Sequence, residues 1–243
     1  MITKAVIAAA GRGTRMLHLT KNKPKPLINV CGKPFLSYLL DHILEAGYKE
    51  LILVGGYKIE RVKRFLDKYH HPVSLVNQFE VLGKEKYGTA CALKCVEDKV
   101  EAEDFLMVYA DHIFSPKDLA SFRKDDEYNY MGTFRCQTPE KYGAVEIVDG
   151  FLEKIVEKPK GYTPGSLVNI GLYKFKPIIF EKINEIELSK RGEYELTDAI
   201  NLLAKEKKVK VEEIKDYWLD FGNPADVMRV SSFIKNENNK TDF

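Results

Sequence analysis

A short stretch near the start of the chain, residues 6–16 (VIAAAGRGTRM), has the composition of a ligand-binding loop. An apolar run passes there directly into a segment that contains Gly11, Arg12, Gly13 and Arg15. Small residues let a ligand come close to the backbone, because at most one methyl group stands in the way. The guanidinium groups favour a negatively charged ligand. The stretch therefore predicts an anion-binding loop.

Two common phosphate-binding motifs do not fit this loop. A P-loop ends in Gly-Lys followed by Ser or Thr, and the loop has no such ending. A dinucleotide-binding fingerprint needs a third glycine, and Met16 stands at that position. The anion must therefore be recognised by a different kind of glycine loop.

The elements around the loop alternate between strand and helix as far as about residue 128. The apolar runs predicted as strands are 3–9, 50–56, 73–77 and 104–111. The stretches predicted as helices are 34–47, 59–69 and 89–98. This alternation favours a mainly parallel sheet covered by helices on both faces, which is an α/β fold.

After about residue 128 the chain becomes richer in strands. Strand-like segments separated by short turns are 130–136, 143–148, 151–157, 167–175 and 209–214, with a helix predicted at 195–206 and another opening at Asn223-Pro224. The chain has no long linker and no internal repeat, so we predict a single domain over residues 1–243. Its halves are about 1–115 and 116–235, and a polar tail at 236–243 is expected to fray.

Composition excludes several classes of function. The 38 basic and 36 acidic side chains leave a formal net charge of +2, which gives no support for nucleic-acid binding. No apolar run approaches 18 residues and the start lacks a signal-peptide layout, so we expect a soluble, cytoplasmic protein without a membrane partner. Cys91 and Cys95 lie on one helical face and are expected to be buried free thiols.

The glycine loop resembles the signature of the sugar-1-phosphate nucleotidyltransferases, also called nucleoside-diphosphate-sugar pyrophosphorylases. That signature reads small-Ala-Gly-x-Gly-Thr-Arg-Met and is followed about ten residues later by Lys-Pro-Leu; residues 9–16 and 25–27 match it here. Stretches similar to further family motifs follow in the same order: GKPFLSYLLDHI, YGTACAL, VYADHIF, KYGAVEI, VEKP, NIGLYKF, RGEYELTDAI and YWLDFGNPADV. The resemblance covers nearly the whole chain and is greatest for glucose-1-phosphate uridylyl- and thymidylyltransferases.

The resemblance implies a fold and a reaction. The fold is a Rossmann-like mixed, mainly parallel sheet, with a nucleotide-binding first half and a β-richer, sugar-phosphate-binding second half. The reaction joins a nucleoside triphosphate, UTP or dTTP for preference, to a sugar 1-phosphate such as glucose 1-phosphate, and releases pyrophosphate. Mg²⁺ is the implied cofactor. Many members are dimers or tetramers, which makes a homo-oligomer compatible with the resemblance.

The resemblance also implies roles for individual residues. Arg15 is expected to hold the β- and γ-phosphates, and Lys25 to contact the α-phosphate. Asp111 and Asp220 match the family's metal ligands. The implied nucleotide-binding residues are Ala10, Gly11, Gly13, Thr14, Gln78 and Gly88, and the implied sugar-phosphate-binding residues are Gly143, Glu157, Lys158, Asn169 and Gly171. Arg12 receives no role.

Three further residues in or next to these motifs, His112, Glu193 and Glu195, are not assigned to the catalytic, metal or binding sets. His112 has no cysteine partner at metal-binding spacing, which favours a packing or polar contact over a ligand role. Glu193 and Glu195 match family positions near the sugar or its supporting residues.

Two other functions remain open at this stage. One is a cytidylyl- or guanylyltransferase acting on another phosphate, such as mannose, heptose, inositol or choline phosphate. The other is a non-catalytic nucleotide-sugar sensor, which is expected to have lost the loop arginine, the lysine or a metal aspartate, whereas all of them are present here.

Overall fold

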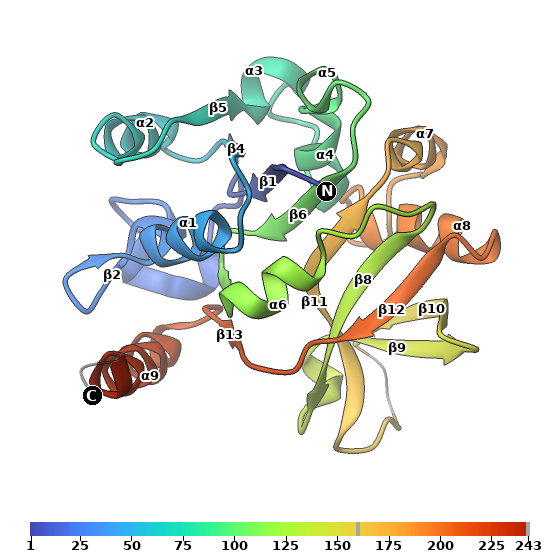
Figure 1. Ribbon diagram of the computed structural model, residues 1–243. Helices are drawn as coiled ribbons and strands as arrows, with labels where there is room; N and C mark the ends of the chain where they lie inside the picture. The colour runs from blue at the N-terminus through green and yellow to red at the C-terminus, as the bar shows by residue number, and fades with distance from the viewer. Residues whose placement is uncertain (159–160, 242–243) are drawn as a thin grey trace.

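A nine-stranded mixed sheet organises the part of the chain that the computed structural model describes, residues 1–158 and 161–241 (Figure 1). Its strand order is β5-β4-β1-β6-β11-β8-β12-β10-β9. The bounds of these strands are β1 Lys4–Ala8, β4 Glu50–Gly55, β5 Val73–Asn77, β6 Phe105–Tyr109, β8 Asn129–Cys136, β9 Gly143–Val148, β10 Phe151–Glu157, β11 Ser166–Phe175 and β12 Val209–Glu213. Strands β5, β4, β1 and β6 pair in parallel, whereas β11 is antiparallel to both β6 and β8. The parallel arrangement expected of the first half is confirmed, and the antiparallel strands of the second half make the whole sheet mixed.

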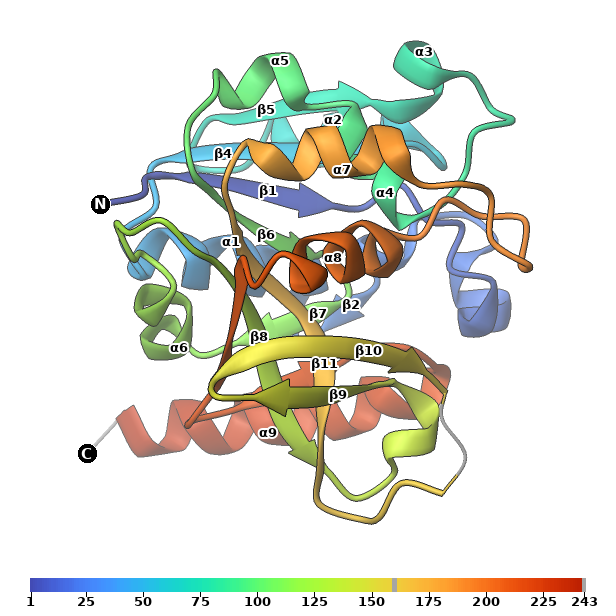
Figure 2. The same cartoon turned by 90° about the vertical axis from the view of Figure 1, so that its right-hand side faces the viewer.

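Helices cover both faces of the sheet, because successive residues of its central strands point in opposite directions. The helices are α1 Phe35–Glu45, α2 Ile59–Leu66, α3 Gln78–Leu82, α4 Thr89–Lys94, α5 Glu97–Val100, α6 Pro116–Ser121, α7 Ile178–Glu185, α8 Leu196–Lys205 and α9 Pro224–Thr241. Val6 of β1 packs in the core shared with α4, α7 and α8, and its neighbours Ala5 and Ile7 pack in the core shared with α1 and α6. Figure 2 shows α7 and α8 on one side of the sheet and α1 on the other.

Short strands and 3-10 helices lie in the loops at the carboxyl ends of the parallel strands. β7 (His112–Phe114) pairs antiparallel with β13 (Trp218–Asp220), and β2 (Asn29–Val30) pairs with β3 (Lys33–Pro34). The 3-10 helices are η1 Thr14–Thr20, η2 Lys25–Leu27 and η3 Pro139–Lys141. A third core cluster joins these pieces to α9, and within it the rings of Phe35 and Phe221 stack 4.2 Å apart. The glycine loop is therefore held by α9, the last helix of the chain.

The structure corrects two details of the sequence prediction. The helix expected at 89–98 is two helices, because Val96 leaves the helical region (φ −116°, ψ 7°) and the chain turns so that both Leu93 and Val100 reach the core. The segment expected to fray continues as helix α9 as far as Thr241, and residues 242–243 lie outside the described residues. Within the described ranges, no helix has the length and apolar character needed to cross a lipid bilayer.

The burial of two cysteines gives a first testable prediction. Cys91 and Cys95 are buried, as expected, and Cys31 is exposed. Burial raises the pKa of Cys95 to about 12, so that at pH 8 roughly one molecule in 10⁴ carries its thiolate, the reactive form. In the native protein we expect iodoacetamide to label Cys31 quickly, and Cys91 and Cys95 only after unfolding, as read by peptide mass spectrometry. Equal labelling of Cys95 and Cys31 in the native state would contradict this packing.

Candidate functional site

A cavity of about 550 Å³ opens where the loops after β1 and β6 meet the start of β9, the end of β10 and the middle of β11. Ligand sites of open α/β sheets typically lie in this position, outside the carboxyl ends of the parallel strands. Every site residue predicted from the sequence lines this one cavity: Ala10, Gly11, Gly13, Thr14, Arg15, Lys25, Gln78, Gly88, Asp111, Gly143, Glu157, Lys158, Asn169, Gly171 and Asp220. The structure thus brings the predicted residues together, and what each of them binds remains a prediction.

The glycine loop is shaped by its contact with η2. Gly13 has φ +62°, and a Cβ added to it would lie 2.9 Å from Cβ of Lys25, so a larger residue would push the two segments apart. The hydroxyl of Thr20 donates to the Gly13 carbonyl at 3.1 Å and closes the turn. Met16 is fully buried in the third core cluster, while Arg15 beside it is exposed at the cavity. In the described part of the chain Arg15 has no ion-pair partner, which leaves its charge available for an anion.

Lys25 and Asp111 form an ion pair at the floor of the cavity. The ammonium group of Lys25, whose side chain is 12% exposed, contacts Oδ2 of Asp111. Burial alone would raise the pKa of Asp111, but the positive charge of Lys25 outweighs burial and holds that pKa well below its ordinary value. Asp111 is therefore a carboxylate throughout the physiological pH range.

Asp111 and Asp220 are brought together by the pairing of β7 with β13. Asp111 immediately precedes β7, and Asp220 is the register partner of His112. Asp220 is held by the hydroxyl of Tyr142, which donates to its Oδ2 at 3.1 Å. Single ligand atoms of Asp111, His112 and Asp220 all lie within 4.8 Å of one another. Because Mg²⁺ typically takes one or two protein carboxylates and fills its shell with phosphate and water, these residues fit a divalent cation.

The wall nearest α3 and α4 offers a polar group without a partner. The side chain of Gln78 is 1% exposed; its Nε2 donates to the Lys86 carbonyl at 3.3 Å, and its Oε1 has no partner among residues 1–158 and 161–241. Gly88 has φ +135°, and a Cβ there would lie 2.2 Å from the Tyr194 carbonyl oxygen, so only glycine fits. This wall therefore combines a close-packed backbone with a buried hydrogen-bond acceptor.

The opposite wall comes from the second half of the chain. Oδ1 of Asn169 accepts hydrogen bonds from the Tyr173 hydroxyl (2.8 Å) and the Gly171 amide (3.1 Å), which fixes the orientation of the Asn169 amide. A Cβ at Gly171 (φ +69°) would lie 2.2 Å from the ring of Tyr109. Lys158 lines the same wall and also reaches a neighbouring hollow beside α9.

Several lining residues were not predicted from the sequence: Tyr87, Tyr109, Lys141, Tyr142 and Arg191. Arg191 lies four residues before Glu195 and pairs with it at 2.8 Å. Glu193 and Glu195 also line the cavity, and their place near the sugar stays a prediction. The i, i+4 spacing of opposite charges within RGEYELTD is the sequence signal that could have found Arg191.

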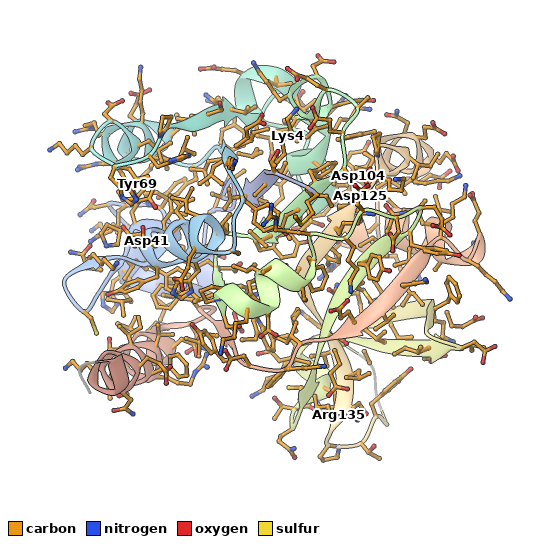
Figure 3. The ribbon with its side chains drawn as sticks, viewed as in Figure 1. Lys4, Asp41, Tyr69, Asp104, Asp125 and Arg135 are labelled. Carbon is orange, nitrogen blue, oxygen red and sulfur yellow. The ribbon has the colours of Figure 1, made fainter. Side chains whose placement is uncertain are left out.

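Two buried lysines far from the cavity are neutralised by acidic partners. Lys174, fully buried, pairs with Asp104 at 3.1 Å, and Lys4 pairs with Glu103 at 3.1 Å. Figure 3 shows Lys4 and Asp104 together with Asp125 near the amino ends of the central strands. The cavity also holds ion pairs, Lys25 with Asp111 and Arg191 with Glu195. It differs in that Arg15, Lys141 and Lys158, from both halves of the chain, line it without an ion-pair partner among the described residues. That arrangement can hold two anionic ligands with a divalent cation between them.

The fold and the cavity together define an α/β protein with a glycine loop and basic side chains at a cavity that suits phosphate-bearing ligands. The chain belongs to the nucleotidyl transferase family, whose sequence model matches residues 4–237. The family expected from the glycine loop and the motifs that follow it is thereby confirmed, as is its nucleotide-diphospho-sugar transferase fold.

Individual relatives agree with this assignment. A bifunctional protein GlmU of Methanocaldococcus jannaschii is 35% identical over 232 residues, which are 95% of this chain and 54% of that protein. The UTP–glucose-1-phosphate uridylyltransferase AglF of Haloferax volcanii is 34% identical over 231 residues, 92% of this chain and 93% of that one. A crystal structure of a UDP-glucose pyrophosphorylase with UDP-glucose superposes with a TM-score of 0.84 at 25% identity, covering 98% of this chain and 100% of the other. The chain thus spans about half the length of the bifunctional relatives.

Proposed function

We propose that the protein transfers a nucleoside monophosphate from a nucleoside triphosphate to a sugar 1-phosphate, giving a nucleoside-diphosphate sugar and pyrophosphate. The observation that carries the proposal is the single cavity that brings Asp111 and Asp220 together with basic side chains from both halves of the chain. The name of the Haloferax relative supports UTP and glucose 1-phosphate as the preferred pair. A protein with this activity contributes to nucleotide-sugar biosynthesis.

In this reaction the protein must position the two substrates and stabilise the negative charge of their phosphates. An oxygen of the sugar phosphate attacks the α-phosphorus in line with the departing pyrophosphate, and this nucleophile is already an anion. Arg15 holds the β- and γ-phosphates, and Lys25 contacts the α-phosphate from the floor of the cavity. Mg²⁺, held by Asp111 and Asp220, supplies neutralisation of phosphate charge when it is bound. No side chain needs to act as a general base.

Gln78 supports the proposed preference for uracil or thymine. Its Nε2 is already engaged by the Lys86 carbonyl, so Oε1 is the group that is free to meet a base. Uracil and thymine present an N3–H donor, whereas N3 of cytosine is an acceptor. Pairing Oε1 with cytosine N3 would leave a buried acceptor unsatisfied, at a cost of about 1–3 kcal/mol.

The sugar-phosphate side of the cavity is tested by Lys158. Replacing Lys158 with alanine removes a charge-assisted hydrogen bond to the sugar phosphate, and we expect the KM for glucose 1-phosphate to rise about tenfold or more. The KM for the nucleotide should change less than about twofold. A matched control is Lys154→Ala on β10, the strand that Lys158 directly follows, since Lys154 pairs with Glu146 at 3.1 Å and does not line the cavity. Equal effects of Lys158→Ala on both substrates would place Lys158 elsewhere.

The proposed function is tested by a matrix of substrates. Pyrophosphate release is measured with each of four nucleoside triphosphates against glucose, mannose and heptose 1-phosphates, inositol phosphate and choline phosphate. We expect the highest kcat/KM with UTP or dTTP and glucose 1-phosphate. Turnover confined to CTP and choline or inositol phosphate would support the cytidylyltransferase alternative. Tight binding of UDP-glucose without turnover of any pair would identify a sensor.

A further inference from the structure

The imidazole of His112 is held at the centre of the site by its surroundings. Its ring makes edge-to-face contacts with Trp218 (5.5 Å between centroids), Tyr109 (6.0 Å) and Phe114 (6.0 Å). The side chain is 12% exposed. His112 is also the cross-strand partner of Asp220, so the backbone pairing places both side chains on the same face of the β7–β13 ribbon. The orientation of the ring is therefore fixed by packing.

The polar neighbours of this ring are the two aspartates. Its Nε2 lies 3.8 Å from Oδ1 of Asp111 and 3.6 Å from Oδ1 of Asp220. Both separations exceed the 2.7–3.2 Å of an N–H···O hydrogen bond, so neither is one. Nδ1 is buried and has no partner within the described residues, so no hydrogen bond through that atom accounts for the placement of the ring.

In both carboxylates one oxygen contacts a neighbouring side chain and the other faces His112. Oδ2 of Asp111 contacts the ammonium group of Lys25, and Oδ2 of Asp220 accepts from the Tyr142 hydroxyl. In each carboxylate it is the other oxygen, Oδ1, that faces Nε2 of His112. Neighbours that engage one atom of a ligand and so orient the rest are typical of metal sites.

The distances from Nε2 to the two carboxylates are close to those between ligands of a common cation. A divalent ion about 2.1 Å from each ligand keeps neighbouring ligands roughly 3.0–3.4 Å apart. The separations of 3.6 and 3.8 Å need to shorten by only a few tenths of an ångström to reach that range. Two aspartates alone would already fit Mg²⁺. The feature that remains to be explained is the position of His112 Nε2 beside both carboxylates.

We propose that His112 is a third protein ligand of the divalent cation and that it biases the site toward transition-metal ions over Mg²⁺. The proposal deepens the proposed function, on which the presence of a cation between Asp111 and Asp220 rests. Mg²⁺ prefers an all-oxygen shell, whereas an imidazole nitrogen favours ions such as Co²⁺ and Zn²⁺. The sequence pattern alone favoured a packing role for His112, and the ring both packs and presents Nε2 to the carboxylates.

The first experiment compares affinities for two ions in the absence of substrates. Co²⁺ and Mg²⁺ are titrated calorimetrically into the wild-type protein, His112→Asn and the control His70→Asn, whose imidazole is exposed beside β5. We expect the wild type to bind Co²⁺ at least about tenfold more tightly than Mg²⁺. His112→Asn should lose roughly tenfold or more in Co²⁺ affinity and less than threefold in Mg²⁺ affinity. Equal losses for both ions, or no loss, would overturn the proposal.

A second measurement detects the nitrogen directly and requires no variant. Mn²⁺ is bound to protein labelled with ¹⁵N-histidine, and pulsed electron paramagnetic resonance records couplings between the ion and nearby nitrogen. A histidine ¹⁵N coupling is expected, and its absence with Mn²⁺ bound would overturn the proposal. Pyrophosphate release without this coupling would leave the proposed function standing and remove His112 as a ligand. The coupling without any turnover would keep the metal site and remove the proposed function.

Discussion

Replacing Asp111 with asparagine is expected to lower kcat/KM for pyrophosphate release by at least about a hundredfold. The carboxylate has two tasks, because its Oδ2 contacts Lys25 and its Oδ1 faces His112 and the proposed cation. An asparagine side chain carries no charge, so it both weakens cation binding and leaves the Lys25 ammonium without its counter-charge. Steady-state turnover with UTP and glucose 1-phosphate measures the effect, with Mg²⁺ varied to separate weak cation binding from slow chemistry.

The matching control for Asp111→Asn is Asp41→Asn. Asp41 also pairs with a lysine, Lys33 at 2.9 Å, and accepts a hydrogen bond from the hydroxyl of Tyr69, which lies near it (Figure 3). Asp41 does not line the cavity. Turnover by Asp41→Asn should equal that of the wild type, and circular dichroism should show that both variants are folded. Asp220→Asn should behave like Asp111→Asn. A double variant of Asp111 and Asp220 that keeps full activity would remove the metal assignment.

The location of the cavity followed from the sequence because parallel strands end at a common edge. Strands β1 and β6 were both visible as apolar runs, and each leads directly into a motif residue, the glycine loop in one case and Asp111 in the other. Neighbouring parallel strands bring such residues together whatever the intervening chain does. The roles of Lys25, Lys158 and Asp220, by contrast, came from the family resemblance, since a lone lysine or aspartate is usually a solvated side chain.

The position of His112 could not be predicted in the same way. It depends on β7 and β13, which are three residues long and pair across about a hundred residues of sequence. Strands this short carry too few residues for an alternating pattern to stand out. Helix α7 escaped prediction for a related reason, because its first three residues, Ile178–Phe180, are all apolar and mask the helical period. Contacts between such segments are tertiary, so the local sequence pattern does not predict them.

Replacing Lys25 with methionine is expected to separate turnover from cation binding. Methionine keeps the apolar stem that packs against Gly13 but lacks the charge that contacts the α-phosphate in the proposed reaction. We expect kcat/KM to fall roughly 100- to 1000-fold, the loss seen when one preorganised donor is removed from a transition state. Affinity for Co²⁺ should stay the same or increase, because the Lys25 ammonium no longer competes for the Asp111 carboxylate.

Turnover and Co²⁺ affinity, measured together, distinguish the role of Lys25 from that of Asp111. Both variants break the same ion pair, so a role confined to holding the floor of the cavity together predicts the same result for each. Under the proposed chemistry, Asp111→Asn loses cation affinity and turnover, whereas Lys25→Met loses turnover alone. Lys25→Arg, which keeps the charge in a bulkier group, should recover part of the activity. A Lys25→Met protein that turns over normally, or that loses Co²⁺ binding as Asp111→Asn does, would mean that Lys25 supports the aspartate and does not contact the reacting phosphate.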